Sequence, residues 1–183
     1  MILVIDMNWK KDSLAYPEFV APIVRAAEAL ETCVVKHFTE VEASDLGKYR
    51  RIILSGTALK DHATLAQPEK FKWLTTLETP VLGICAGMQT IGVTFGLRLR
   101  RCLRIGMTQV TTLKENPLFS SQFRAYSLHN FSVESSQEFD SLAESANCLQ
   151  AMKHKEKPVY GVLFHPEVRN PEILERFIRV KQL

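Results

Sequence analysis

A cysteine at the end of an apolar run is the first candidate for chemistry in this chain. The stretch PVLGICAGMQTIG, residues 80–92, places Cys85 where strand-like residues give way to helix-forming ones. A G-x-C-x-G turn from a strand into a helix is typical of a nucleophile elbow, which favours a thiolate and leaves the next backbone N–H free for an oxyanion. Buried cysteines are also common as small apolar side chains, so this motif alone leaves both interpretations open.

A second apolar run supplies possible partners for the cysteine. The stretch YGVLFHPEV, residues 160–168, ends in His165 and Glu167, separated by Pro166. A cysteine nucleophile needs a base within hydrogen-bond reach and a third group that orients the base. Alone, His165 is equally compatible with a strand terminus and Glu167 with a solvated turn. Together with the elbow they predict a Cys-His-Glu site, if both strand ends meet at one edge of a sheet.

The first half of the chain reads as alternating strands and helices. Apolar runs at 2–6, 51–56 and 79–85 predict strands that are buried on both faces, as in a parallel sheet. Helical spacing of apolar residues appears at 17–31 and 67–78. This pattern indicates a βαβαβ-like arrangement.

The second half contains shorter strand-like pieces. They follow the helix that begins after Cys85 and lie at 107–113, 123–129, 147–153 and 158–165. The polar segment 153–158 predicts a hairpin tip between the last two. In the final segment, 170–183, Asn170 can cap a closing helix and Pro171 can occupy its first turn. No repeat or long linker divides the chain, which predicts one domain over residues 1–183.

Composition narrows the class of protein. The chain has 183 residues, a formal charge of +3 and a hydrophobic fraction of 46%, ordinary values for a folded globular protein. Its N-terminus shows neither a signal peptide nor a membrane span, and no block of charge indicates a nucleic-acid partner. The densest basic run, RLRRCLR at 98–104, predicts a solvated strand or loop face, with a docking patch for an acidic partner as the alternative.

The cysteines indicate neither a metal site nor a disulfide framework. The four, at 33, 85, 102 and 148, lack the close paired spacing of zinc ligands. We therefore expect no bound metal, and reduced thiols in a cytoplasmic protein.

The two motifs together resemble a known family. GICAGMQ followed by GVLFHPEV resembles the class I glutamine amidotransferases, and the stretch AMKHKEKPVYGVLFHPEV, residues 151–168, is most similar to the glutaminase part of GMP synthase. The resemblance implies a flavodoxin-like α/β fold, an open, mostly parallel mixed sheet flanked by helices. It also implies that Cys85 attacks the carboxamide of glutamine, that His165 transfers the proton and that Glu167 orients His165.

The resemblance further implies a substrate pocket, with departures from the family pattern. The expected substrate-binding and oxyanion residues are Gly56, Thr57, Ala86, Gln89, His129, Asn130 and Phe131. Thr57 stands where the family has a second glycine, so a positive φ there would cost about 1 to 3 kcal/mol. Ala86 is smaller than usual and predicts an open wall beside the substrate, and Leu128 replaces a familiar serine before His129.

The resemblance also bears on partners and cofactors. The chain contains no P-loop and no dinucleotide fingerprint. We therefore expect no cofactor here, with ATP and Mg²⁺ used by a separate ATP-dependent synthetase subunit that receives the ammonia. Two alternatives remain open at this point: a hydrolase of another γ-glutamyl compound, and a non-catalytic regulatory relative. A redox-sensing role for Cys85 is a further variant.

Overall fold

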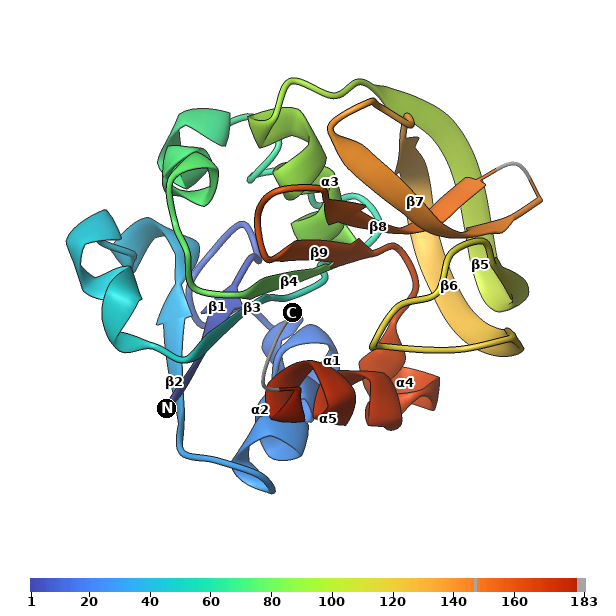
Figure 1. Ribbon diagram of the computed structural model, residues 1–183. Coiled ribbons are helices and arrows are strands. Elements are labelled where there is room, and N and C mark those ends of the chain that lie inside the picture. Colours follow the sequence, from blue (N-terminus) through green and yellow to red (C-terminus); the bar gives the residue numbers. More distant parts are fainter. Residues whose placement is uncertain (147, 181–183) are drawn as a thin grey trace.

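A mixed sheet forms the centre of the molecule. The computed structural model describes residues 1–146 and 148–180, and in that part the sheet has nine strands with helices on both faces (Figure 1). The strands are β1 (Ile2–Asp6), β2 (Cys33–His37), β3 (Arg51–Leu54), β4 (Val81–Ile84), β5 (Leu99–Thr112), β6 (Gln122–Val133), β7 (Phe139–Ser145), β8 (Cys148–His154) and β9 (Val159–Val162). The helices are α1 (Tyr16–Phe19), α2 (Ala21–Glu28), α3 (Ala86–Thr94), α4 (Pro166–Arg169) and α5 (Pro171–Arg179), with 3-10 helices η1 (Phe38–Glu40), η2 (Ala43–Lys48) and η3 (Pro68–Thr75).

The parallel half of the sheet has the flavodoxin-like order. The strands run β2-β1-β3-β4-β9, and all four neighbouring pairs are parallel. The four inner strands are fully buried, which explains their unbroken apolar runs. The expected fold class is thereby confirmed. The sequence pattern does not predict strand β2, because this strand lies at the edge of the sheet, is only half-buried and contains Lys36.

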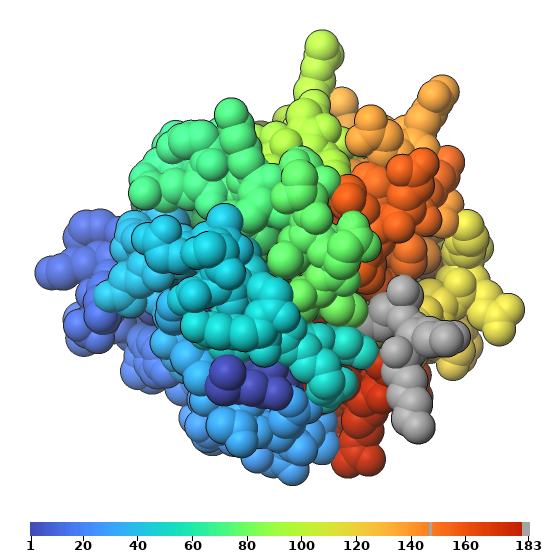
Figure 2. Space-filling view, turned by 60° about the vertical axis from the view of Figure 1, so that its left-hand side comes forward, coloured from blue at the N-terminus to red at the C-terminus, as the bar shows by residue number. Residues whose placement is uncertain are grey.

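The antiparallel half continues the same sheet through β8, β7, β5 and β6. The predicted hairpin at 153–158 is present, since Met152 on β8 pairs with Gly161 on β9. Strands β5 and β6 form a long curved ribbon at the side of the molecule (Figure 1). In Figure 2, the first half of the chain, blue to green, covers most of the visible face, and the orange β7–β9 region borders it.

A disulfide closes the curled end of the sheet. Cys102 on β5 and Cys148 on β8 are joined although 46 residues separate them, with their Cα atoms 6.5 Å apart. The expectation of reduced thiols is therefore wrong for these two cysteines. The cysteines then no longer support the expectation of a cytoplasmic protein. Within the described residues, Cys33 and Cys85 are free thiols. The first residue of the predicted strand 147–153 lies outside the described residues.

Close backbone packing fixes helix α3 against the sheet. A Cβ at Gly83 would lie 2.5 Å from the carbonyl carbon of Gly87, and a Cβ at Gly87 would lie 2.6 Å from the Leu54 carbonyl oxygen. No larger residue fits at either position without displacing the backbone. The helix that follows Cys85 therefore rests directly on β3 and β4.

The predicted helix at 67–78 is a 3-10 helix instead of an α-helix. It spans Pro68–Thr75, and Phe71 and Leu74 are buried three residues apart on its packed side, with Leu77 three residues further on, just past its end. A three-residue repeat suits the three residues per turn of a 3-10 helix better than the 3.6 of an α-helix.

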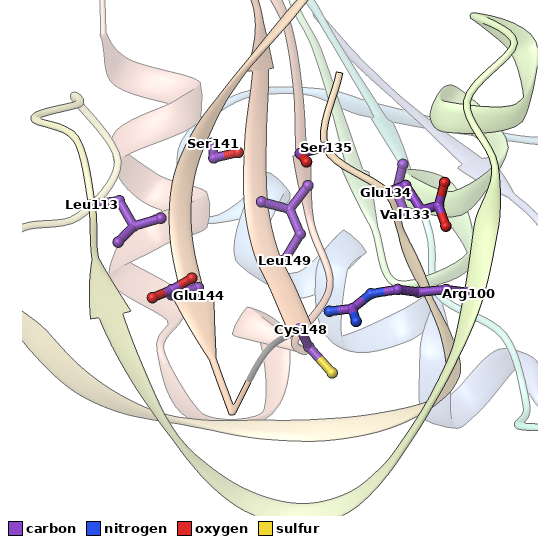
Figure 3. Close-up of a pocket in the computed structure, with 9 residues that line it drawn as sticks. All are labelled: Arg100, Leu113, Val133, Glu134, Ser135, Ser141, Glu144, Cys148 and Leu149. Carbon is purple, nitrogen blue, oxygen red and sulfur yellow. The ribbon is translucent and has the colours of Figure 1, made fainter. Parts of the chain in front are cut away.

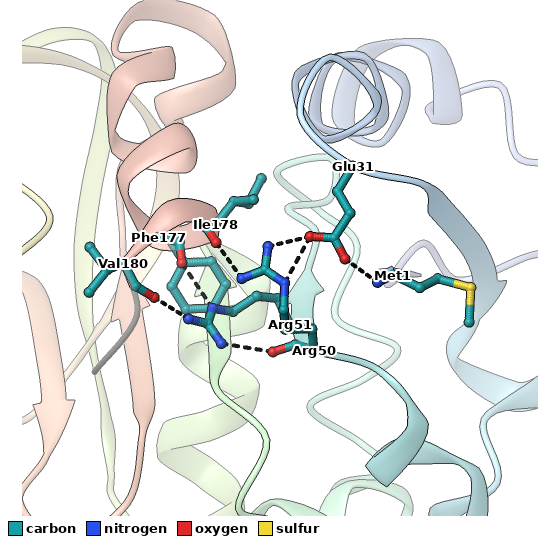
Figure 4. Close-up of polar contacts among 7 residues, drawn as sticks. All are labelled: Met1, Glu31, Arg50, Arg51, Phe177, Ile178 and Val180. Atoms are coloured by element: carbon teal, nitrogen blue, oxygen red, sulfur yellow. Dashed lines mark hydrogen bonds and ion pairs between the residues drawn. The ribbon is translucent and has the colours of Figure 1, made fainter.

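The closing helix is tied to the sheet by two arginines (Figure 4). Arg50 Nη1 donates to the Ile178 carbonyl at 2.8 Å, and Arg51 Nε donates to the Phe177 carbonyl at 3.1 Å. These guanidinium groups satisfy carbonyls that the end of α5 leaves free. Asn170 precedes α5 as expected but makes no side-chain capping bond, and residues 181–183 of the predicted helix lie outside the described part. Since α4 leads directly into α5, this anchor also holds the segment after β9.

Candidate active site

Cys85 occupies the expected elbow. It has φ 49° and ψ −101°, a conformation that costs a residue other than glycine about 1 to 3 kcal/mol. Its backbone N–H donates to the Val162 carbonyl at 2.8 Å. The cysteine therefore stands between the end of β4 and the end of β9, at the N-terminus of α3. In this structure its thiol donates to the Leu128 carbonyl at 3.4 Å.

His165 and Glu167 meet just beyond the end of β9. The ring Nδ1–H of His165 donates to Glu167 Oε1 at 2.7 Å, and the side chains are 1% and 0% exposed. The backbone N–H of His165 donates to the Tyr126 carbonyl at 2.8 Å, which fixes the chain at the base of the ring. The other ring atom, Nε2, has no hydrogen-bond partner in the described part of the chain.

The environment of His165 favours its protonated form. Burial opposes the positive charge and lowers the pKa, but the negative charges of Glu167 and of a Cys85 thiolate act in the other direction. The pKa of His165 is consequently raised well above 6.5. A protonated imidazole beside the cysteine can act as a general acid at neutral pH.

Five of the seven expected pocket residues line a small cavity beside the cysteine. The lining includes Cys85 together with Thr57, Ala86, Gln89, His129 and Asn130. The cavity measures about 10 Å³, which is far below the range of about 300 to 1,000 Å³ typical of ligand pockets. The small side chain of Ala86 therefore does not leave the wall open as predicted, because the loop after β3 covers it.

Gly56 and Phe131 lie outside that lining. A Cβ at Gly56 would be only 2.6 Å from Cε1 of His165, so this glycine makes room for the imidazole. The Phe131 ring packs edge-on against His62 with centroids 5.6 Å apart, and the Phe131 carbonyl accepts from Gln89 Nε2 at 2.9 Å. Both residues thus contact side chains of the site instead of the cavity.

Thr57 adopts an ordinary backbone conformation. In the described residues it is absent from the non-glycine positions with positive φ, so the strain expected at this position does not occur. Its side chain is buried and its hydroxyl donates to the Asp61 carbonyl at 3.2 Å. A threonine is therefore compatible with this loop shape.

His129 presents a neutral hydrogen-bond acceptor. Its Nδ1–H donates to the Cys102 carbonyl at 2.8 Å, and the ring is 1% exposed. Burial is the main reason that the pKa of His129 is lowered to about 4. The buried Nε2 atom carries no proton in this tautomer and has no partner among the described residues.

Four cavity residues were not singled out from the sequence. They are Ala58, Leu59, Asp61 and His62, and Leu128 also lines the cavity. Asp61 Oδ2 accepts from the Trp9 backbone N–H at 2.7 Å, which ties the loop after β3 to the loop after β1. In the sequence, the polar residues KDH at 60–62 after a buried strand could have pointed to Asp61 and His62. They were not predicted because a loop has no periodic pattern that marks its functional residues.

A larger hollow lies in the antiparallel half, and its lining includes Cys148 but not Cys85 (Figure 3). It measures about 400 Å³ and shares no lining residue with the cavity beside Cys85. Arg100 and the carboxylates of Glu134 and Glu144 are among the residues around it (Figure 3).

Two further features concern metals and membranes. Residues 1–146 and 148–180 contain no cluster of side chains suited to holding a metal ion. The same ranges contain no helix with the length and apolarity needed to cross a bilayer.

The fold, Cys85 at one strand end and the His165–Glu167 pair beyond the neighbouring strand point to a class of protein. A flavodoxin-like sheet carries a strained cysteine at one strand end and a buried histidine–carboxylate pair beyond the neighbouring strand. The family model described as "Glutamine amidotransferase class-I" matches residues 15–180. The chain belongs to this family.

Individual relatives are consistent with this membership. The glutamine-hydrolyzing GMP synthase subunit of Methanocaldococcus jannaschii is 42% identical over 112 residues, which cover 55% of this chain and 60% of that relative's length. The corresponding subunit of Methanococcus maripaludis strain C6 is 34% identical over 178 residues, covering 91% and 87%. A crystal structure of a Thermoplasma acidophilum protein has a TM-score of 0.81 at 23% identity, covering 97% and 92%, and shares the fold.

Proposed function

We propose that this chain hydrolyses glutamine through Cys85, His165 and Glu167 and passes the ammonia to a separate ATP-dependent synthetase subunit. The observation that carries the proposal is that Cys85, at the end of β4, is bonded through its backbone to the end of β9, just beyond which His165 and Glu167 form a buried pair. The likeness to the glutamine-hydrolyzing subunits of GMP synthases supports a synthetase that converts XMP to GMP. In this proposal the partner subunit uses ATP and Mg²⁺, and this chain needs no cofactor of its own.

The first half-reaction transfers the glutamyl group to sulfur. The Cys85 thiolate attacks the carboxamide carbon, an S–C bond forms, and the carbonyl electron pair moves to oxygen. The backbone N–H of Ala86, in the first turn of α3, and that of Thr57 are the proposed donors to this oxyanion. His165 then gives the Nε2 proton to the leaving nitrogen, the C–N bond breaks, and ammonia departs.

The second half-reaction returns the enzyme to its starting state. His165, now neutral, accepts a proton from water as the water oxygen attacks the thioester carbon. The C–S bond breaks, glutamate leaves, and the thiolate and imidazolium are restored. Glu167 holds the Nδ1–H of His165 throughout, which keeps Nε2 directed at the reaction.

Substrate entry requires the cavity to widen. The Asn130 side-chain amide donates to the Leu59 carbonyl at 2.8 Å and holds the loop after β3 over Cys85. Movement of this loop would open the pocket, and the neutral Nε2 of His129 would then accept an N–H of the bound glutamine. Cys85 would turn from the Leu128 carbonyl toward His165.

A glutamate-release assay tests the proposal. The chain is mixed with glutamine, with and without a purified GMP synthase synthetase subunit plus XMP, ATP and Mg²⁺. We expect glutamate release and GMP formation in the complete mixture, loss of both in Cys85→Ala, and no loss in the matched variant Cys33→Ala, whose thiol lies on β2. Full activity of Cys85→Ala would overturn the mechanism.

The same assay separates the alternatives. Partner-independent hydrolysis of γ-glutamyl peptides, without use of glutamine, would favour the γ-glutamyl hydrolase. A Cys85 that does not react with a glutamine-like electrophile, in a chain that still binds the synthetase, would favour the regulatory relative. Thr57→Gly is expected to change the rate little, because the native loop is unstrained at this position. A large rise would show that this loop limits activity.

A further inference from the structure

An apolar stripe lies exposed along β5. Leu103, Ile105 and Met107 are 47%, 65% and 41% exposed. They occupy alternate positions of the strand, whereas their even-numbered neighbours are less accessible. We call these three side chains the β5 stripe. Single exposed apolar residues are ordinary, but three in succession on one strand form a patch typical of interaction sites.

The β5 stripe borders the catalytic cavity through strand β6. The antiparallel register places Ile105 opposite Leu128 and Met107 opposite Tyr126, so these pairs share one face of the sheet. Leu128 lines the cavity, and its carbonyl accepts from the Cys85 thiol. A protein docked on the stripe would therefore lie next to the strand that carries Leu128, one residue away from the lining of the catalytic cavity on the neighbouring strand.

The charges around the stripe are positive and uncompensated. Arg101 and Arg124 are exposed near its two ends, since Arg124 pairs with Gln109 just beyond Met107. Neither arginine forms an ion pair within the described residues. This contrasts with Arg100, whose hollow also contains two carboxylates (Figure 3).

We propose that the β5 stripe is the docking surface for the synthetase subunit, through an apolar patch on that subunit flanked by carboxylates. The inference rests on the proposed function, because it is the ammonia acceptor that must lie beside the site. A second copy of this chain fits poorly, since a two-fold contact would bring arginines against arginines. Nucleic acid fits poorly as well, because the centre of the surface is aliphatic and offers no stacking platform.

Binding to the purified synthetase subunit of a GMP synthase, measured by titration calorimetry, tests this inference. Ile105→Arg places a charge at the centre of the stripe and is expected to weaken binding at least about tenfold. Leu14→Arg is the matched control, because Leu14 is 99% exposed in a turn of the N-terminal half. Arg101→Glu and Arg124→Glu are expected to weaken binding mainly at low salt. Thermal unfolding checks that each variant is folded.

The possible results lead to different conclusions. Equal affinities of Ile105→Arg and Leu14→Arg would overturn the docking surface, as would no binding by the native chain. A native dimer that Ile105→Arg dissociates would assign the stripe to a second copy. Binding of a DNA duplex that Arg101→Glu abolishes would assign it to nucleic acid.

A separate result bears on the proposed function alone. If Ile105→Arg disrupts the complex but the native complex releases no glutamate from glutamine, the docking surface stands and the glutaminase proposal fails. If glutamate is released and Ile105→Arg still binds normally, the glutaminase stands and the docking surface fails.

Discussion

Replacing Glu167 by glutamine removes the negative charge that pairs with His165 but keeps a side chain of nearly the same size and shape. In the native site the pair is buried, and the Nδ1–Oε1 distance is 2.7 Å. His165 is further enclosed by the rings of Phe19 and Tyr126, with centroids 5.8 and 6.3 Å away. Water therefore cannot replace the lost charge. Burial, which disfavours the imidazolium, then lowers the pKa of His165 without the compensating charge of Glu167.

The magnitude follows from this arrangement. An adjacent opposite charge shifts a pKa by about 1 to 3 units, which corresponds to about 1.4 to 4 kcal/mol. The pKa of His165, raised well above 6.5 in the native chain, should fall toward or below 6.5 in Glu167→Gln. In the proposed mechanism the imidazolium protonates the leaving nitrogen, so activity is expected to be lost as pH rises through this pKa. The alkaline limb of the pH–activity profile should therefore move to lower pH by about 1 to 3 pH units.

The assay is the pH dependence of kcat/KM for glutamate release, measured in the presence of the synthetase subunit. A rate lower by up to about 10²-fold is expected at the optimum, because the imidazole also loses its orienting partner. Glu172→Gln is the control: its carboxylate lies in the first turn of α5 and should leave the limb in place. An alkaline limb that does not move in Glu167→Gln would refute this account of His165.

Three further predictions follow from contacts near the site. Asn130→Ala frees the loop over Cys85 and should speed alkylation of that thiol by iodoacetamide about 2- to 10-fold, the equivalent of one hydrogen bond; an unchanged rate would exclude Asn130 as a latch. Gly56→Ala should lower kcat on the order of 10²-fold and reduce the free energy of unfolding by about 1 to 3 kcal/mol, because the added Cβ displaces the enclosed His165 ring; native kcat would contradict the close packing. Reducing the disulfide, which spans 46 residues, should lower the free energy of unfolding by about 2 to 4 kcal/mol and Tm by roughly 5 to 15 °C. Reductant should have no effect on a variant that lacks both cysteines. A native Tm that is insensitive to reductant would show that the bridge does not stabilise the fold.

The sequence predicted those parts of the fold that have a local pattern. The buried strands β1, β3 and β4 appear as unbroken apolar runs, and the hairpin before β9 appears as a polar tip between two strands. Strand β7 was missed, because FDSLAES has irregular alternation and two register shifts against β8. The edge strand β2 was missed because its residues are only partly buried.

The parts that depend on distant residues could not be predicted. The disulfide joins positions 46 residues apart through the curl of the sheet, which spacing alone does not reveal. The packing of Gly56 against His165 joins the ends of β3 and β9, and a glycine in sequence does not identify its neighbour. By contrast, the elbow at Cys85 and the pairing of His165 with Glu167 are local in sequence, and the structure has both.

The central claim is that the sulfur of Cys85 carries the glutamyl group between the two half-reactions. The most direct test is mass spectrometry of the chain mixed with the synthetase subunit, exposed to glutamine and quenched in acid within one turnover. The account predicts a glutamyl adduct on the peptide that contains Cys85, absent in Cys85→Ala and more abundant where deacylation is slowed. Glutamate release at the native rate with no adduct on Cys85, or with the adduct on another residue, would contradict it.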